Sequence, residues 1–294
     1  MRTVLTALAI GLLVTTAVSA QSLIGEPHIV AVTAGDTLLS LGSRFGIDPA
    51  TIARDNARSP EAPLRVGEML RLDNRHIIPA FTPGTAILIN VPQRMLFLAA
   101  EGGARAFPVA VGRAGWPTPL GAFSIVSKEV NPTWDVPESI REEARRAGRS
   151  LPQKVPPGPD NPLGAYWMAL SGGGIGIHGT NVPSSVYRAV THGCIRLRPE
   201  DIAALFAEVQ VGAKGVLTYQ PVLAAVAGSD IFVEAHRDVY GRGPADALAF
   251  VKAQTQALGV FDRIDWAVVA QVIRERAGIA RVVTLAHSDG PDAK

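Results

Sequence analysis

Hydrophobic and polar residues alternate in short runs through the middle of the chain, and turn-forming residues separate these runs. Alternation with a period of two is typical of β-strands that bury one face. The runs that show it are residues 86–91, 95–100, 107–112, 122–127, 165–170, 175–178 and 215–219. Their close spacing predicts an antiparallel sheet or sandwich, so we expect this part of the chain to be mainly β.

Two stretches within this region break the alternation. Ser139 and Glu142 have the spacing of a helix capping box, and Gly148 is placed to end the helix that they begin. Residues 151–164 contain too many prolines for a helix or a strand, so we expect a long ordered loop or lid there. A further helix is expected from Pro199, because the apolar residues that follow have helical spacing: Ile202, Leu205, Phe206 and Val209.

A smaller unit precedes the sheet region. Its pattern predicts a strand, two helices and a closing strand over residues 28–73. Asp36 is a candidate cap for the first helix, and Asp48 with Pro49 has the form of an N-cap followed by the first helical residue. The polar, proline-containing residues 74–85 are expected to form a linker to the sheet region.

The C-terminal residues 221–294 form a third region, for which we expect an α/β structure. Residues 231–239 resemble a strand, and residues 244–258 have a helical pattern. Asp265 can cap a second helix, which Gly278 is placed to end.

The N-terminus has the form of a secretory signal peptide. A basic residue at Arg2 is followed by an uncharged apolar run, and Val18-Ser19-Ala20 supplies the small residues that precede a cleavage site. We therefore expect residues 1–20 to be removed after Ala20 and the protein to lie in the periplasm; the alternative is an uncleaved membrane anchor. No later segment is apolar over a length that spans a bilayer.

The charge balance bears on the partners of the protein. Removing Arg2 lowers the formal net charge from +2 to +1, and no run of basic residues is present. Nucleic acid is therefore not an expected partner. The remaining 274 residues (294 − 20) exceed a typical single domain, which agrees with the several units that the pattern predicts.

Candidate chemistry centres on Cys194, the only cysteine, in the sequence THGCIRL. One cysteine cannot form an internal disulfide, and we find no metal site or cofactor motif. His178 lies sixteen positions earlier (194 − 178) at the end of a predicted strand, and a nearby base could generate the thiolate. Backbone N–H groups of residues 192–194 could form an oxyanion hole, and Gly193 would let a substrate carbonyl approach closely. The alternative is that Cys194 is a buried packing residue.

The blocks around this cysteine resemble the L,D-transpeptidases with a YkuD-type catalytic domain, from Ala86 to Tyr219. The matching stretches, in order, are TPLG (118–121), NPTW (131–134), PGPDNPLG (157–164), IHGTN (177–181), and THGCIRL with its exit to Ile202 (191–202). The segments IFVEAHRDVY and IDW also resemble the tail of the Gram-negative subgroup. The resemblance implies a YkuD-type β-sandwich with inserted helices over residues 86–220.

The resemblance also implies a role for each site residue. Cys194 would be the nucleophile and His178 the general base, with a backbone carbonyl near Gly179 orienting the imidazole. His192, Gly193 and Thr191 would form the pocket and the oxyanion hole. Arg196 would bind a substrate carboxylate or have a structural role, the simplest being a surface salt bridge.

The implied reaction is a two-step acyl transfer on peptidoglycan. Cys194 would attack the carbonyl of the L-centre of meso-diaminopimelate in a tetrapeptide stem, releasing D-Ala and leaving a thioester. An amine would then take the acyl group; it could be a second stem, giving a 3-3 crosslink, or a lysine of an outer-membrane lipoprotein. A cysteine peptidase or amidase that uses water instead is the alternative within the same chemistry.

The N-terminal unit resembles a LysM module, a small domain that binds peptidoglycan or chitin. The match includes GDTL (35–38), Asn56 and the ending V-G-x-x-L (66–70). It implies glycan contacts at Gly35, Asp36, Thr37 and Leu38 and near residues 63–66. A module that only acts as a spacer is the alternative. A non-catalytic wall-binding protein that uses this module alone is a further reading, against which the THGC context argues.

Overall fold

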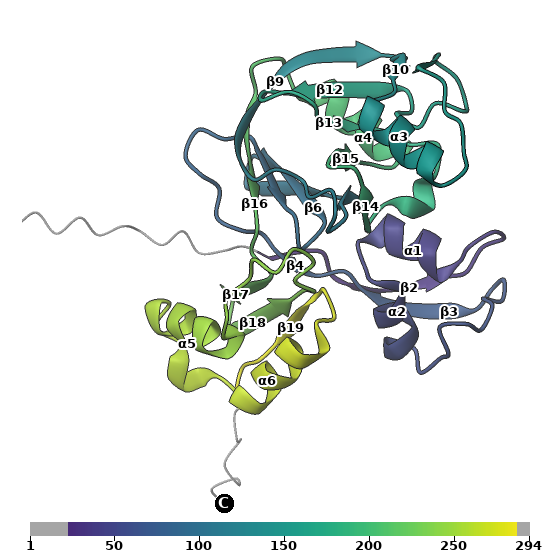
Figure 1. The fold of residues 1–294 in the computed structure, drawn as a ribbon. Helices are drawn as coiled ribbons and strands as arrows, with labels where there is room; N and C mark the ends of the chain where they lie inside the picture. Colours follow the sequence, from purple (N-terminus) through teal and green to yellow (C-terminus); the bar gives the residue numbers. More distant parts are fainter. Residues whose placement is uncertain (1–22, 287–294) are drawn as a thin grey trace, which may run out of the picture.

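A computed structural model describes residues 23–286 of the chain, so the expected signal peptide lies outside the described residues. Three units follow one another in Figure 1: an N-terminal module, a large β-rich unit and a C-terminal unit. Among the described residues, no helix combines the length and the apolar character that a bilayer crossing requires.

The N-terminal module has the predicted order of a strand, two helices and a strand. Its elements are β2 (Pro27–Ala31), α1 (Leu38–Phe45), α2 (Pro49–Asp55) and β3 (Met69–Asp73), with β2 and β3 antiparallel. Asp48 caps α2 as predicted. The cap of α1 is Thr37, not Asp36, because the carboxylate of Asp36 accepts hydrogen bonds from the backbone N–H and the hydroxyl of Thr33 instead.

The predicted linker after this module contains a buried strand. β4 (His76–Ile77) pairs with β1 (Leu23–Ile24), and both residues of β4 are buried. The segment from residue 74 therefore begins as part of the packed structure, and the expectation of a plain linker was wrong there.

The β-rich unit contains one mixed sheet of eight strands, in the order β15-β13-β12-β9-β16-β5-β6-β7. In chain order, the strands are β5 (Ile87–Asn90), β6 (Met95–Ala100), β7 (Gly103–Pro108), β9 (Gly121–Val130), β12 (Tyr166–Leu170), β13 (Gly176–His178), β15 (Ile195–Arg196) and β16 (Lys214–Thr218). The purely antiparallel prediction was wrong for two pairs, since β16–β5 and β13–β15 are parallel. Parallel strands need a crossover of a dozen or more residues, and residues 179–194 provide one between β13 and β15.

The two ends of this sheet come together, so the sheet is curled rather than split into the two layers of a sandwich. Ala110 follows β7, and its backbone exchanges hydrogen bonds of 2.8 and 3.0 Å with the backbone of Arg196 in β15. Side chains from both ends share one apolar core, which α4 (Pro199–Glu208) covers with Ile202 and Leu205. Val209 is also buried in this core and Phe206 packs against it, so the stripe expected for this helix is confirmed at all four positions.

Short elements surround the curled sheet. β8 (Val111–Gly112) pairs with β14 (Ala189–Thr191), β10 (Trp134–Asp135) pairs with β11 (Lys154–Val155), and α3 (Glu138–Arg146) lies between β10 and β11. The predicted capping box was wrong: Ser139 lies inside α3, which begins after Pro137 without a side-chain cap. Ala147 caps the other end, and Gly148 follows it with a left-handed backbone.

The C-terminal unit is a three-stranded antiparallel sheet with two helices. Its elements are β17 (Val222–Ala227), β18 (Asp230–Ala235), α5 (Ala247–Ala257), α6 (Trp266–Glu275) and β19 (Ala280–Val282). Asp265 caps α6 as predicted, but α6 ends at Arg276 in a left-handed conformation, two residues before the predicted Gly278. α5 begins after Asp246, later than the pattern indicated.

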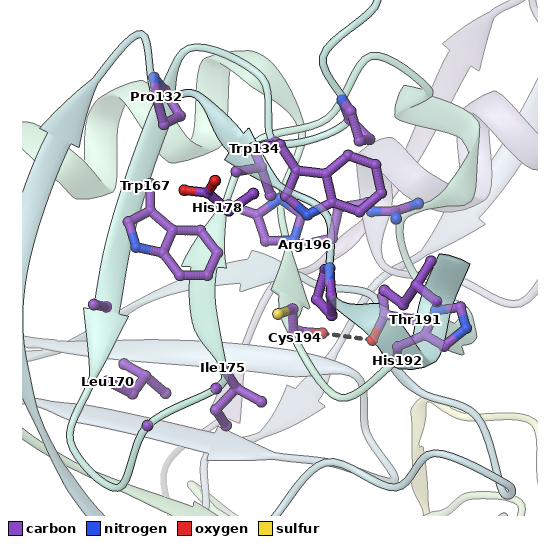
Figure 2. A pocket seen from close by; sticks show the side chains of 18 of the residues that line it. Pro132, Trp134, Trp167, Leu170, Ile175, His178, Thr191, His192, Cys194 and Arg196 are labelled. Atoms are coloured by element: carbon purple, nitrogen blue, oxygen red, sulfur yellow. Dashed lines mark hydrogen bonds between the residues drawn. The ribbon is translucent and has the colours of Figure 1, made fainter. Parts of the chain in front are cut away.

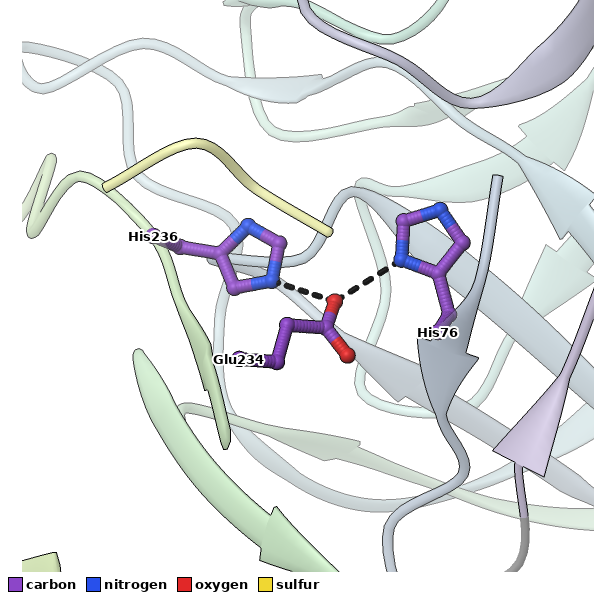
Figure 3. A group of neighbouring side chains, drawn as sticks. All are labelled: His76, Glu234 and His236. Carbon is purple, nitrogen blue, oxygen red and sulfur yellow. Dashed lines mark hydrogen bonds and ion pairs between the residues drawn. The ribbon is translucent and has the colours of Figure 1, made fainter. Parts of the chain in front are cut away.

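A buried polar cluster joins the units (Figure 3). Glu234 of β18 is fully buried, and its Oε1 lies 2.8 Å from His76 Nδ1 and 2.7 Å from His236 Nε2. His76 Nε2 in turn lies 2.9 Å from the carbonyl oxygen of Gly46, at the end of α1. These side chains are of metal-binding types, but the three ligand atoms are already used in hydrogen bonds to one another. Gln93, between β5 and β6, also donates to Glu234 Oε1 at 3.1 Å, so the cluster links the module, the β-rich unit and the C-terminal unit directly.

Candidate active site

A cleft of about 1120 Å³ opens beside the turn that carries Cys194. Its walls come from β9, β12 and β13 on one side and from the segment of β10 and α3 on the other. Figure 2 shows His178, Cys194, Arg196 and Trp167 around this cavity. The structure thus brings the predicted nucleophile and the predicted base to one cleft.

His178 is held in one orientation at the end of β13. Its Nδ1 lies 2.7 Å from the carbonyl oxygen of Gly179, as the resemblance implied, so Nδ1 carries the proton and Nε2 is the basic nitrogen. Trp167 is its cross-strand partner on β12 and stacks on the imidazole with ring centroids 5.7 Å apart. Burial, together with the nearby charge of Arg196, lowers the pKa of His178 to about 3. The ring is therefore a neutral base at physiological pH.

Cys194 is a free, half-buried thiol on the turn between β14 and β15. Burial raises its pKa above the ordinary value, while a backbone hydrogen bond from Gly176 and the charge of Arg196 oppose the rise. Since the thiol keeps its proton and His178 is neutral, the resting pair is uncharged. Proton transfer to His178 must then accompany the attack on a substrate.

Thr191 organises the turn before the nucleophile. Its hydroxyl donates to the carbonyl oxygen of Cys194 at 2.6 Å and accepts from the N–H of Gly193 at 3.2 Å. Gly193 has φ +108°, a conformation that a residue with a Cβ rarely adopts. The N–H of Gly193 is thus occupied, whereas the N–H of Cys194 has no hydrogen-bond partner among residues 23–286. Of the expected oxyanion donors, the N–H groups of His192 and Cys194 are therefore the ones that the turn leaves without a partner among the described residues.

His192 lines the cleft but is engaged elsewhere. Its Nε2 lies 2.9 Å from Glu143 Oε2 of α3, and Arg113 Nη2 lies 2.6 Å from the same carboxylate. Hydrogen bonds from Arg113 and then His192 lower the pKa of Glu143 to about 2. Figure 2 shows the His192 ring pointing away from the sulfur of Cys194. His192 therefore anchors α3 at the mouth of the cleft, and it packs against Trp116 with centroids 5.2 Å apart.

Arg196 projects into the cleft from β15. Its Nη1 donates to Ser185 Oγ at 3.0 Å, and its buried Nε has no partner. Among the described residues, no carboxylate forms a salt bridge with it, so the surface-salt-bridge reading was wrong. An unpaired guanidinium in a cleft is suited to an anionic ligand.

The proline-rich segment is an ordered wall of the cleft. Asn161, which is 1% exposed, donates to the carbonyl oxygen of Pro132 at 2.8 Å, and its Oδ1 accepts from the N–H of Leu163 at 2.9 Å. These bonds tie the PGPDNPLG stretch to the NPTW stretch, although the two lie far apart in the sequence.

The candidate glycan contacts lie in the separate N-terminal module and do not reach the cleft lining. Asp36 and Thr37 use their side chains within the turn and the helix cap, and Leu38 is a core residue that is 8% exposed. Gly35 has open space around it, and Val66 of the neighbouring loop is 73% exposed.

Sequence patterns did not predict four residues that contact the two histidines of the cleft or their partners, namely Trp167, Trp116, Glu143 and Arg113. Trp167 could have been found, since its strand was predicted to run antiparallel to the strand of His178. The contacts of Glu143 with His192 cross 49 positions of the chain, and no local pattern signals such a pair.

The chain is similar to known L,D-transpeptidases. The model of the YkuD L,D-transpeptidase catalytic domain matches residues 84–222. The chain is similar to the probable L,D-transpeptidase ErfK/SrfK of Salmonella typhimurium, with 30% identity over 87% of this chain and 86% of that protein. It is 31% identical to the probable L,D-transpeptidase YbiS of Escherichia coli K12, over 69% of this chain and 67% of that protein. An L,D-transpeptidase structure from Mycobacterium tuberculosis H37Rv covers 66% of this chain and 91% of its own, with 15% identity and a TM-score of 0.36.

Proposed function

The chain belongs to the family of L,D-transpeptidases with a YkuD catalytic domain, and on this premise we propose that Cys194 and His178 carry out its reaction. The reaction is peptidoglycan L,D-transpeptidation. The observation that supports the assignment of residues is a free thiol and a neutral, oriented imidazole on one cleft.

The first step forms a thioester. Cys194 Sγ adds to the carbonyl carbon on the L-centre of meso-diaminopimelate, while His178 Nε2 takes the thiol proton. The N–H of Cys194 donates to the oxygen that becomes negative. When the C–N bond to D-Ala breaks, His178 gives the proton to the leaving amine.

The second step transfers the acyl group to an amine. The amine nitrogen attacks the thioester, its proton passes to His178, and the C–S bond breaks to release the thiolate, which regains the proton. Both a second peptidoglycan stem and a lipoprotein lysine supply such an amine. Hydrolysis by water remains the alternative outcome of the same thioester.

Arg196 is proposed to bind a substrate carboxylate. Its guanidinium lines the cleft near the nucleophile, has a buried and unpaired Nε, and lacks an acidic partner among the described residues. A diaminopimelate stem carries a free carboxylate close to the reacting carbonyl, and such a group would pair with Arg196.

The decisive experiment incubates the mature protein with tetrapeptide muropeptides and identifies the products by mass spectrometry. Crosslinked dimers or exchange of D-Ala support transpeptidation, whereas tripeptides alone support hydrolysis. Cys194→Ala is expected to abolish both products while the fold and wall binding persist. Turnover that survives in this variant would refute the assignment of the thiol.

We also propose that the N-terminal module is a LysM module that binds the glycan strand. The strand–helix–helix–strand order supports this, and so does the exposed loop around Val66. Deleting residues 28–73 would be a poor test, because Ala277 and Ile279 of the C-terminal unit pack into the module core. Val66→Arg is expected to weaken sedimentation with isolated sacculi, while Val211→Arg, at a 58% exposed position outside the module, serves as the control. Equal sedimentation of the two variants would favour a spacer.

Export to the periplasm is part of the same proposal, because the substrate lies there. It is supported by the form of residues 1–20. N-terminal sequencing of the protein from a periplasmic extract tests the cleavage after Ala20.

A further inference from the structure

A tyrosine of the C-terminal unit reaches the turns that support the nucleophile. The hydroxyl of Tyr240 donates to the carbonyl oxygen of Gly112 at 2.6 Å and accepts from the N–H of Thr118 at 3.0 Å. Its ring stacks on Tyr219 with centroids 5.3 Å apart, and its N–H donates to Tyr219 Oη at 2.7 Å. Tyr219 in turn donates to Asp238 Oδ1. Tyr240 is therefore fixed at the ring, the hydroxyl and the backbone.

Thr118 connects this tyrosine to the catalytic turn. Thr118 is fully buried, and its hydroxyl donates to the carbonyl oxygen of Gly193 at 2.9 Å while accepting from the N–H of Gly112 at 2.8 Å. The turn is tight, since a Cβ on Gly112 would lie 2.2 Å from the carbonyl oxygen of Trp116. A single residue thus separates the hydroxyl of Tyr240 from the peptide that precedes Cys194.

The direction of that peptide matters for catalysis. In a trans peptide the C=O and the following N–H point in opposite directions, and the described residues contain no cis peptide bond. With its carbonyl oxygen held by Thr118, the Gly193–Cys194 peptide must point the N–H of Cys194 away from Thr118. This N–H has no hydrogen-bond partner among residues 23–286, so it is available to an oxyanion.

We propose that Tyr240 is a positioning residue for acyl transfer: through Thr118 it fixes the Gly193 carbonyl and so aims the Cys194 N–H at the developing oxyanion. The proposal rests on the assignment of Cys194 as the nucleophile. It gives the C-terminal unit, which lies beyond residues 84–222 of the family match, a part in the reaction.

The test compares two reactions of the same thiol. Acylation by a tetrapeptide develops a negative oxygen, whereas alkylation by iodoacetamide displaces iodide and develops none. Tyr240→Phe removes only the hydroxyl, and Tyr166→Phe is a matched control on β12, where the ring packs against Phe206. Loss of one oxyanion donor lowers kcat by about 10²–10³. Since Tyr240→Phe loosens the donor without removing it, we expect kcat for acylation to fall by about tenfold to a hundredfold.

The alkylation rate and KM of Tyr240→Phe are expected to stay within about twofold of wild type, because neither depends on an oxyanion. Thr118→Val is expected to show the same selective loss, and Thr118→Ser, which keeps the hydroxyl, should recover most of the rate. A parallel fall of alkylation and acylation would show a merely disordered site and overturn the proposal. So would unchanged acylation in Tyr240→Phe. Absence of acylation in the wild-type protein would instead refute the assignment of Cys194.

Discussion

The buried cluster around Glu234 gives a quantitative prediction for the variant Glu234→Gln. The carboxylate is fully buried and has four donors around it. Oε1 accepts from His76, His236 and Gln93 at 2.8, 2.7 and 3.1 Å, and Oε2 accepts from the N–H of Ile77 at 2.6 Å. Glutamine has the same shape but offers one oxygen and one NH₂ group.

The magnitude follows from the better of the two amide orientations. With its oxygen at the Oε1 position, glutamine keeps three acceptor contacts but places its NH₂ against the N–H of Ile77. Two buried donors then face each other, and each unsatisfied group costs about 1–3 kcal/mol. We therefore expect the free energy of unfolding to fall by about 2–6 kcal/mol, the combined cost of the two unsatisfied donors.

The same cluster makes the wild-type protein sensitive to acid. The hydrogen bonds and charge of His76 and His236 outweigh burial and lower the pKa of Glu234 to about 2. A carboxyl whose pKa is lower in the folded state stabilises the protein above its unfolded pKa of about 4.3, and this stabilisation is lost as the pH falls toward 2. Burial also lowers the pKa of His236, so a further loss begins as the pH falls below about 6.5.

The assay is urea denaturation followed by tryptophan fluorescence, from pH 3 to 8. The control is Glu208→Gln, because Glu208 forms an exposed pair with Arg105 whose loss is expected to change the free energy of unfolding by less than about 1 kcal/mol. Glu234→Gln should lower the midpoint at pH 7 and flatten the pH dependence below pH 4.5. A midpoint at pH 7 equal to that of Glu208→Gln would refute the reasoning.

Three further predictions concern the cleft. Arg196→Gln removes the charge expected to pair with a substrate carboxylate, so KM should rise about tenfold or more. For a substrate whose carboxylate is amidated, KM should be the same in the variant and the wild type. A higher KM in the variant for that substrate too would contradict carboxylate binding by Arg196. Glu143→Gln weakens the contact of α3 with His192 and should speed tryptic cleavage within α3, while Glu208→Gln, which lies in α4, should leave the rate of that cleavage unchanged; equal rates in the two variants would contradict the anchoring role of Glu143. Because burial raises the pKa of Cys194, its alkylation rate should still increase with pH above about 8.5; a plateau near pH 7 would indicate a preformed ion pair instead.

Local patterns predicted most elements but few of their ends. The run at residues 95–100 coincides with β6, because alternation and turn residues are encoded within the strand itself. Caps were predicted less well: Asp36 and Thr37 are both capping residues, and only three-dimensional context shows that Asp36 bonds Thr33 instead. β17 was not predicted, since its residues are all apolar and therefore show no alternation.

The site was predictable where a motif carried it. Cys194 and His178 lie in short, distinctive stretches, and their meeting at one cleft follows from the parallel pairing of β13 with β15. Glu143 and Tyr240 make contacts that span 49 and 128 positions of the chain. Sequence spacing cannot identify such partners, because the curl of the sheet and the packing of the C-terminal unit decide them.

The C-terminal unit contacts both the N-terminal module and the catalytic region that the family model matches. β18 supplies Glu234, whose cluster reaches the end of α1, and the segment after α6 supplies Ala277 to the core of the N-terminal module. The segment after β18 supplies Tyr240 to the turns beneath Cys194. α1 also packs against the short helix Pro183–Ser185, which lies between His178 and Cys194 in the chain. Because the same unit braces both the module and the catalytic turn, the module is held in a fixed relation to the cleft. A glycan strand bound by the module would then present its stem peptides to Cys194 at a constant offset, which a freely tethered module could not impose.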